Sequence, residues 1–578
     1  MQDFRGALQR RERDSFARHP GAKALLLLGT GALLGCSSPT ASPSVPAGVG
    51  AGANAVAGAG SGGSGGGAMQ VGGMGSGQPE IINKAIHRLS NVEYDNTVRD
   101  LTGTTLRFGD SFVNEEAEGF DNIATALSMS PRQVEDYFTA ARQVSADIFG
   151  NPTLKAGIVT CTPDTGTSCA EKVIGEFGAK AFRRPLTADE GAGLLKKYQE
   201  ALALGVDALA DLQHVVHIVL ASPQFLYRIE ADPDLTSAAP HKLDGYELAS
   251  RLSYALWSSM PDDELFGKAA SGALVSPAAL EAEVDRMLAD GRSEMLVKNF
   301  AARWFGSKRL DDHVASATMF PDYSPALAAS MQREMELFFS EFLYKDLPYT
   351  QLLTADFNFV DAPLAALYGV AAPAQGTQRI VNTTDQRVGL LGLAGFLTHT
   401  SRETRSSPII RGKWVLYAVL CTPLAVPAGL VVSPLEEPAA GSAPTTVRLQ
   451  MAAHRVSPVC AGCHDMIDPI GLALENYDAI GRYRTAYDNG LPVDATGTLP
   501  DGAKVDGLPS LVAALSTSPK FLPCAATKLA TYALGATSSS VNEEQIVARW
   551  VSGTPTLRSL IKQTVTHESF TSRKAESL

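Results

Sequence analysis

Two cysteines and a histidine late in this 578-residue chain have the spacing of a haem-attachment motif. Cys460, Cys463 and His464 form the pattern C-x-x-C-H within the pentapeptide Cys-Ala-Gly-Cys-His. On a helix, residues three apart lie on one face, where both thiols can form thioethers with the two vinyl groups of a haem. The adjacent imidazole then reaches the iron as the proximal ligand. The pattern predicts one covalent haem c on Cys460 and Cys463, with His464 bound to iron.

The same pentapeptide has other interpretations, namely a chance match, a local disulfide or part of a zinc site. Zinc needs further Cys or His ligands at short spacing, and the sequence has no second C-x-x-C pair. Export of the chain favours haem over the alternatives, so the N-terminus bears directly on the choice.

The N-terminus predicts export and a lipid anchor. A basic stretch precedes a short apolar segment, Ala24 to Leu34, which is too short to span a bilayer as a mature helix. Cys36 follows directly after the small residue Gly35, as in the lipobox of bacterial lipoproteins. We expect residues 1–36 to be the signal and lipobox, with cleavage before Cys36 and acylation of its thiol. An ordinary signal peptide or a tail anchor is the alternative.

The next segment, residues 37–79, is almost entirely Gly, Ala, Ser, Pro and Val. It cannot bury enough apolar surface to offset the entropy lost on ordering, which predicts a disordered, flexible tether. A lipidated Cys followed by a tether holds a globular body close to a membrane. We therefore expect a lipoprotein of the outer membrane or cell surface that faces the periplasm or the exterior.

The composition bounds the partners of the remaining 500 or so residues, a length that suits two to four domains. The net charge of −12 argues against nucleic acid as a partner, because nucleic acids are bound by clusters of Lys and Arg. The expected partners are the membrane, through the lipid, and an unidentified redox protein. No nucleophile elbow, phosphate-binding glycine loop or H-E-x-x-H motif is present, so nothing indicates a hydrolase or a kinase.

Four of the seven cysteines are left after the lipid and haem assignments. An oxidising compartment favours their pairing. Cys161 and Cys169 flank a turn-rich segment and are expected to close a short loop, which leaves Cys421 and Cys524 for each other. Four free thiols are the alternative.

The periodicity of apolar residues predicts a mainly α protein with a multi-helical body and little β structure. The C-x-x-C-H motif adds the expectation of a C-terminal cytochrome-c-like haem module. Expected helices include residues 83–101, 207–229 and 386–397. Breaks rich in Pro and polar residues divide the body into N-terminal helical domains at 80–231, central helical domains at 242–422 and a haem module at 448–578.

The second axial ligand is less defined by the sequence. No Met occurs after Met466, which is too close to His464 to reach the opposite face of the same haem. The candidates are His454 first, His399 second and Met451 third, with His567 downstream, or an open position. Two protein ligands would indicate electron transfer, and an open site would permit peroxide or oxygen chemistry.

Seven stretches carry a resemblance to a known family; they are His87–Leu101, Gly119–Asn122, Ala181–Thr187, Ala249–Trp257, Ser407–Trp414, Asp468–Asn476 and Leu529–Gly535. Together they resemble the large exported bacterial proteins built from consecutive "planctomycete surface" domains of unknown function, which often end in a cytochrome-c-like motif. The resemblance implies export and haem, and it implies no reaction or substrate.

The predicted function is therefore that of a lipid-anchored c-type haem protein of the cell envelope, working in electron transfer. Two alternatives stay open. The helical body could bind an unknown substrate for a haem-linked oxidoreductase, so whether the chain is an enzyme is undecided. The chain could also be a surface interaction protein without a redox role.

Overall fold

The structure is a computed structural model that describes residues 86–163, 166–205, 207–234, 237, 239–424, 444–455 and 458–574. Contacts divide the chain into two units, Met1–Gly75 and Ser76–Leu578, and all the described residues belong to the second. The predicted signal, Cys36 and the tether lie outside the described residues.

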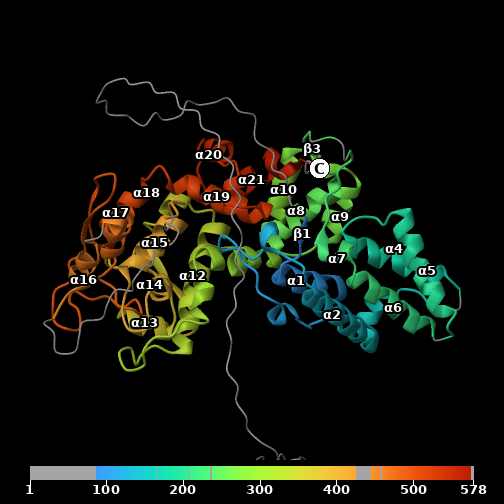
Figure 1. Cartoon of the computed structure of the whole chain (residues 1–578), viewed down its shortest axis with the longest axis horizontal. Helices are drawn as coiled ribbons and strands as arrows, with labels where there is room; N and C mark the ends of the chain where they lie inside the picture. The colour runs from blue at the N-terminus through green and yellow to red at the C-terminus, as the bar shows by residue number, and fades with distance from the viewer. Residues whose placement is uncertain are drawn as a thin grey trace, which may run out of the picture. The chain divides into compact units, whose positions relative to one another are not determined.

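Helices dominate the described chain, which confirms the predicted mainly α class (Figure 1). The N-terminal part holds β1 (His87–Arg88), α1 (Asn91–Thr102), η1 (Gly109–Ser111), η2 (Ala124–Ala126), α2 (Pro131–Gly150), α3 (Pro152–Ile158), α4 (Ser168–Phe182), α5 (Ala188–Leu202), α6 (Ala208–Leu220), α7 (Pro223–Leu226) and β2 (Tyr227–Arg228).

The central part begins with β3 (His241–Lys242), α8 (Gly245–Trp257), α9 (Asp263–Ala270), η3 (Ala273–Val275), α10 (Pro277–Ala289), η4 (Gly291–Ser293), η5 (Leu296–Ala301), α11 (Ala302–Trp304) and η6 (Ser307–Leu310). It continues with α12 (Pro325–Tyr344), η7 (Tyr349–Gln351), β4 (Phe357–Val360), α13 (Ala362–Tyr368), β5 (Gln378–Val381), η8 (Leu390–Gly392), α14 (Ala394–His399) and α15 (Pro408–Ala418).

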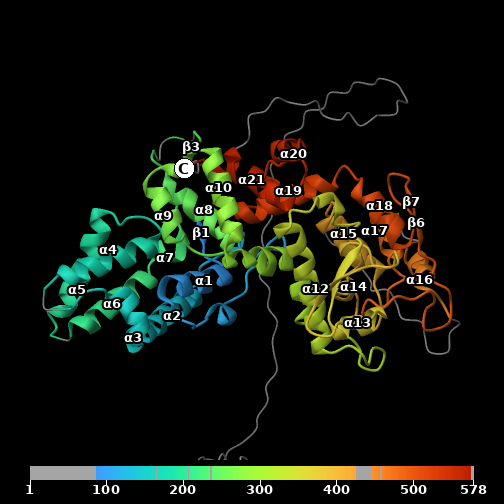
Figure 2. The ribbon, with the colours of Figure 1, turned by 180° about the vertical axis from the view of Figure 1, so that it is seen from behind.

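The C-terminal part holds α16 (Val447–His454), α17 (Pro458–Leu472), β6 (Thr496–Thr498), β7 (Lys504–Asp506), α18 (Gly507–Ser516), α19 (Phe521–Leu534), η9 (Ser538–Ser540), α20 (Glu544–Trp550), α21 (Leu557–Val565), α22 (Glu568–Thr571) and β8 (Ser572–Arg573). The β6–β7 pair contacts α17 and α18 (Figure 2). None of the described helices is both long enough and apolar enough to cross a membrane.

The strands form four antiparallel pairs, β1–β2, β3–β8, β4–β5 and β6–β7. Two of them join distant parts of the chain: His87 pairs with Arg228 in β1–β2, and His241 pairs with Arg573 in β3–β8. These short pairs connect helical segments that are far apart in the chain.

Three expected helices differ from the observed ones for local reasons. Helix α1 begins after Ser90, which forms a capping box with Glu93, and the preceding residues pair as β1. The helix expected over 207–229 stops before Pro223, which begins α7. Within 386–397 the backbone turns at Gly389, whose φ is +57°, so regular helix begins only at Ala394.

The interior contains two large hydrophobic clusters and one small cluster. One cluster is formed by residues of 89–226 together with Tyr254. The other takes Phe120 and Ile123 and then residues from 243 to 570, so helices of the central and C-terminal parts share one core. The small cluster packs Val447 and Met451 of α16 against Leu472 of α17.

Two glycines allow α15 and α17 to lie in close contact. A Cβ on Gly471 would stand 1.9 Å from the carbonyl oxygen of Pro408, and a Cβ on Gly412 would stand 2.2 Å from that of Ile467. Any side chain at either position would push the helices apart. The position of α17, which carries the C-x-x-C-H motif, is therefore set by α15.

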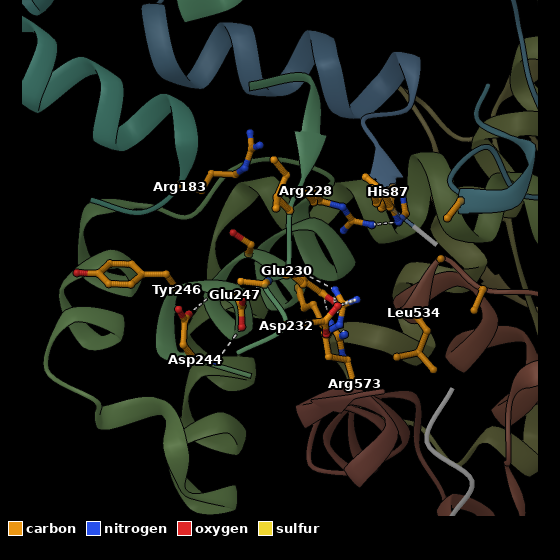
Figure 3. A pocket seen from close by; sticks show the side chains of 18 of the residues that line it. His87, Arg183, Arg228, Glu230, Asp232, Asp244, Tyr246, Glu247, Leu534 and Arg573 are labelled. Atoms are coloured by element: carbon orange, nitrogen blue, oxygen red, sulfur yellow. Dashed lines mark hydrogen bonds and ion pairs between the residues drawn. The ribbon is translucent and has the colours of Figure 1, made fainter. Parts of the chain in front are cut away.

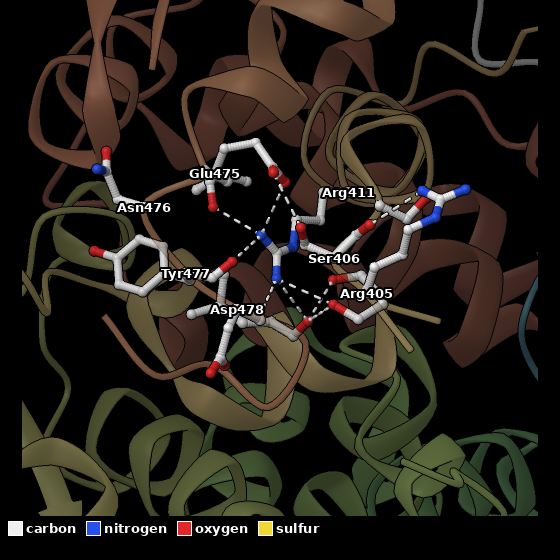
Figure 4. A network of polar contacts seen from close by, with 12 residues as sticks. Arg405, Ser406, Arg411, Glu475, Asn476, Tyr477 and Asp478 are labelled. Atoms are coloured by element: carbon white, nitrogen blue, oxygen red, sulfur yellow. Dashed lines mark hydrogen bonds and ion pairs between the residues drawn. The ribbon is translucent and has the colours of Figure 1, made fainter. Parts of the chain in front are cut away.

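A fully buried arginine on α15 fixes the chain that leaves α17 (Figure 4). Arg411 donates hydrogen bonds to the carbonyl oxygens of Leu474, Tyr477 and Asp478, at 2.7, 2.9 and 2.8 Å. Its guanidinium also lies 3.6 Å from the buried carboxylate of Glu475. Arg411 thus has a structural role in this segment.

Two disulfides are present, Cys161–Cys169 and Cys421–Cys524, and both predicted pairings are confirmed. The second links the end of α15 to α19 across a sequence separation of 103 residues. It therefore links the segment after α15, the helix against which α17 packs, covalently to α19.

Candidate functional site

Helix α17 presents the two thiols and the imidazole of the motif together. Cys460 and Cys463 are both partly exposed, and neither takes part in a disulfide. Their spacing on an α-helix places them on one face with His464, one turn after Cys460. This arrangement is the one that two thioether bonds and a proximal ligand require.

The imidazole of His464 is buried and held by a carboxylate one turn further along α17. Its Nδ1 lies 2.8 Å from Oδ1 of Asp468, and the two residues are 7% and 1% exposed. Histidine ligands of metals commonly donate their second ring N–H to a carboxylate, which sets the tautomer and the ring orientation. With Nδ1 bound in this way, Nε2 is the nitrogen that would bind iron.

The carboxylate of Asp468 is buried beside one cationic side chain. Burial raises the pKa of Asp468 above its usual value, while the bond to His464 and the charge of Arg455 act in the opposite direction. Nη1 of Arg455 lies 3.6 Å from Oδ2 of Asp468, and Nη2 pairs with Asp465. Arg455 follows α16 directly and so connects the end of that helix to α17.

A cavity of about 370 Å³ adjoins this flank of α17. Its walls include Arg448, Arg455, Asp468 and the β6 segment Thr496–Thr498. Asp468, a polar partner of His464, and Arg455 therefore border open space. By the spacing of residues on a helix, this side of α17 faces away from the core residues Ile467 and Ile470.

The candidates for the second axial ligand lie in different parts of the structure. His454 is the last residue of α16, and its side chain lies outside what the structure describes. Met451 is buried one turn earlier and packs against Leu472 of α17. His399 lies apart from these two and contacts Gly306 and the ring of Trp414.

His399 is held neutral by its surroundings. Burial lowers the pKa of its imidazole to about 3. The ring centroid of Trp414 lies 6.0 Å from that of His399, and that of Phe396 lies 5.9 Å away. These neighbours lie on α14 and α15, and none is on α17. His567, the downstream histidine, is buried at the start of α22, where its Nδ1 accepts a hydrogen bond from Ser569.

Two residues of this site, Asp468 and Arg455, were not among the predicted site residues. The signal for Asp468 was its spacing of four residues from His464, which brings two helical side chains together. Arg455 could not be found in this way, because it lies outside α17 and its contact with Asp468 is a tertiary one.

Comparison with family profiles finds four consecutive domains, each described as a protein of unknown function. They are PSD3 (DUF1587) at residues 87–150, PSD5 (DUF1595) at 169–230, PSD4 (DUF1592) at 243–370 and PSCyt3 (DUF1588) at 387–487. No curated protein and no solved structure matches the chain.

The chain is thus built from consecutive planctomycete-type domains, which confirms the predicted resemblance. PSCyt3 is the cytochrome-c-like domain among them, and its matched range includes Cys460, Cys463 and His464. The matched range begins within the central part and ends before α18.

Proposed function

We propose that this chain is a c-type haem protein of the bacterial cell envelope whose role is electron transfer. The observation that carries the proposal is the His464–Asp468 pair beside two thiols that form no disulfide. A disulfide loop would have joined Cys460 to Cys463, and a zinc site would need more ligands; no group of three or more His, Cys, Asp or Glu suited to a metal occurs in the described part of the chain.

The residues present fit one covalent haem. Cys460 and Cys463 would hold the vinyl groups, and Nε2 of His464 would bind the iron, which when bound supplies a one-electron couple. Asp468 acts on this site through His464, since it orients the ring and accepts a hydrogen bond from its Nδ1–H. The cytochrome-c-like domain match supports the same assignment.

The direct test is the pyridine haemochrome spectrum and the intact mass of protein matured in a host with haem-attachment machinery. We expect a c-type spectrum and a mass increased by one haem. Cys463→Ser should leave one thioether or abolish attachment, whereas Met466→Leu on the same helix should retain haem. Complete extraction of haem by acid acetone would contradict covalent attachment.

The location forms a second part of the proposal. Cys36 would carry the lipid, and residues 37–79 would separate it from the helical unit, which suits an outer-membrane or surface lipoprotein working with a redox partner protein. Cys36→Ser should move the protein from the membrane fraction to the soluble fraction. Unchanged fractionation would contradict the lipid anchor and leave the haem assignment standing.

A further inference from the structure

Four of the five stretches that carry the family resemblance outside the haem domain meet at a second cavity. This cavity has a volume of about 640 Å³ (Figure 3). Its walls include His87, Arg183, Arg251 and Leu534, each from a different one of those stretches. None of its lining residues lies on α17 or within residues 387–487. The haem proposal therefore does not account for this cavity.

Two strand pairs, β1–β2 and β3–β8, and one glycine bring the walls of the cavity together. Pairing of β1 with β2 sets His87 beside Arg228, and pairing of β3 with β8 brings Arg573 to the same wall. Gly535, with φ of +60°, lies directly against the imidazole of His87. A Cβ at this position would stand 2.3 Å from Cε1 of that ring, so only glycine allows the contact. Segments more than 400 residues apart are thus held in contact around the cavity.

Two arginines of the cavity wall are each paired with a carboxylate. Arg251 forms a bidentate ion pair with the carboxylate of Glu230. Nη2 of Arg573 lies 2.9 Å from Oδ2 of Asp232. Two guanidinium groups thus pair with two carboxylates. Two further carboxylates, those of Asp244 and Glu247, also line the cavity (Figure 3) and accept hydrogen bonds from each other's backbone N–H at the start of α8.

The two arginines of the other wall form no short ion pair within the described part of the chain. Arg183 is 3% exposed and donates to the carbonyl oxygens of Gln224, Phe225 and Tyr227 rather than to a carboxylate. The side chain of Arg228 is 10% exposed; it bonds to Nδ1 of His87, and its ion pair with Glu93 is 3.8 Å long.

The guanidinium of Arg228 is incompletely paired. Nε of Arg228 has no hydrogen-bond partner in the described part of the chain. Burial raises the pKa of Glu93, which favours the neutral form of the carboxyl group that pairs with Arg228. A buried guanidinium without a full counter-charge is costly, and a bound carboxylate is the group that its geometry matches.

We propose that this cavity binds a small organic anion whose carboxylate contacts Arg228 and whose apolar body lies against Phe182 and Leu534. Both apolar side chains line the cavity and are buried. The volume lies within the range of about 300–1,000 Å³ that small-molecule sites occupy. The site would be a property of the helical body that is independent of haem attachment.

The test is calorimetric titration of the purified full chain with benzoate, hexanoate and the uncharged isostere benzamide. We expect benzoate or hexanoate to bind, and benzamide to bind at least roughly tenfold more weakly than benzoate. Arg228→Gln should weaken binding of the carboxylate by about thirtyfold or more, and Arg228→Lys by less, because it retains the charge. Arg132→Gln, at an exposed arginine of α2, is the matched control and should change nothing.

Circular dichroism establishes that each variant is folded. If Arg228→Gln does not fold, Ala231→Trp serves instead, because Ala231 is exposed yet lines the cavity, so a large ring there would block the ligand. Failure of both carboxylates to bind the folded wild-type chain overturns the proposal. Equal binding of benzoate and benzamide, or binding unaffected by Arg228→Gln or Ala231→Trp, overturns it as well.

Discussion

Nδ1 of His464 lies 2.8 Å from Oδ1 of Asp468, and both side chains are buried on the same helix. The pair joins the predicted haem motif to a carboxylate that is absent from the C-x-x-C-H pattern. Such a partner makes the imidazole more electron-donating and fixes its orientation, so the properties of a bound haem should depend on Asp468.

Asp468→Asn should raise the reduction potential of the haem. Loss of the anionic acceptor weakens donation from His464 and so disfavours the ferric state. A hydrogen bond to a charged group contributes about 1.5–3 kcal/mol, which is about 60–130 mV for one electron. Potentiometric titration measures the shift, with haem content checked by mass. Asp465→Asn, at a more exposed carboxylate one residue after His464, is the control; an equal shift there would contradict a specific role for Asp468.

Gly471→Ala should displace α17 from α15 and destabilise the protein by at least about 2–3 kcal/mol, because the new Cβ would overlap the backbone of Pro408. Gly462→Ala is a matched change on the same helix, where a Cβ meets nothing within 4 Å, and should be neutral or stabilise the fold by up to about 1 kcal/mol. Urea unfolding compares the two, and equal stability of both variants would show that the close packing of α15 and α17 is dispensable.

The ferric haem should be low-spin with two protein ligands, and His454→Ala should convert it to high-spin. His399→Ala should leave the optical spectrum unchanged and lower the stability by about 2 kcal/mol or more, because this imidazole is packed against Trp414 and Gly306. A high-spin wild-type spectrum would favour chemistry at an open iron site. A low-spin spectrum that survives both substitutions would point to another ligand, with Met451 next to be replaced.

Removal of the Cys421–Cys524 disulfide should cost more stability than removal of Cys161–Cys169. Loop-closure entropy predicts about 4.7 kcal/mol for the 103-residue separation and about 2.5 kcal/mol for the 8-residue one. Paired Cys→Ala substitutions at each bridge, compared by urea unfolding, measure the difference. The reverse order would mean that the long bridge does not constrain the unfolded chain.

Stability should fall as the pH rises because of Glu334, a fully buried carboxyl group on α12. Burial raises its pKa to about 8, and both its oxygens lie 2.8 Å from the hydroxyl of Tyr368. The native state therefore binds a proton that the unfolded state releases above its ordinary pKa of 4.5. The folded state loses up to about 1.4 kcal/mol per pH unit between these two values.

Urea unfolding from about pH 5 to about pH 8 tests this prediction. Glu334→Gln should remove much of the slope, because the amide does not titrate. Glu336→Gln, at a more exposed position on the same helix, should leave the slope unchanged. A slope identical in wild type and Glu334→Gln would show that other groups cause the pH dependence.

Local patterns in the sequence were sufficient for several conclusions. The helical class and the resemblance to consecutive planctomycete-type domains each depend on residues close together in the chain. The disulfide pairing also followed from the sequence, because the lipid and haem assignments left only four cysteines to combine. The predicted helix boundaries were wrong at Gly389 and Pro223, where the backbone changes direction. Apolar periodicity does not report the conformation of a single residue.

The sequence by itself determined the C-x-x-C-H motif and the residue types around it, because thiol and imidazole spacing on one helix is a local property. Only the tertiary structure decided that α17 packs against α15 at Gly412 and Gly471. It also decided that His399 packs against Gly306 and Trp414, away from α17. It also decided that Arg183 and Arg228 meet at one cavity wall. These contacts join residues far apart in the chain, and they depend on how closely backbones can pack and which distant strands pair, neither of which a local pattern encodes.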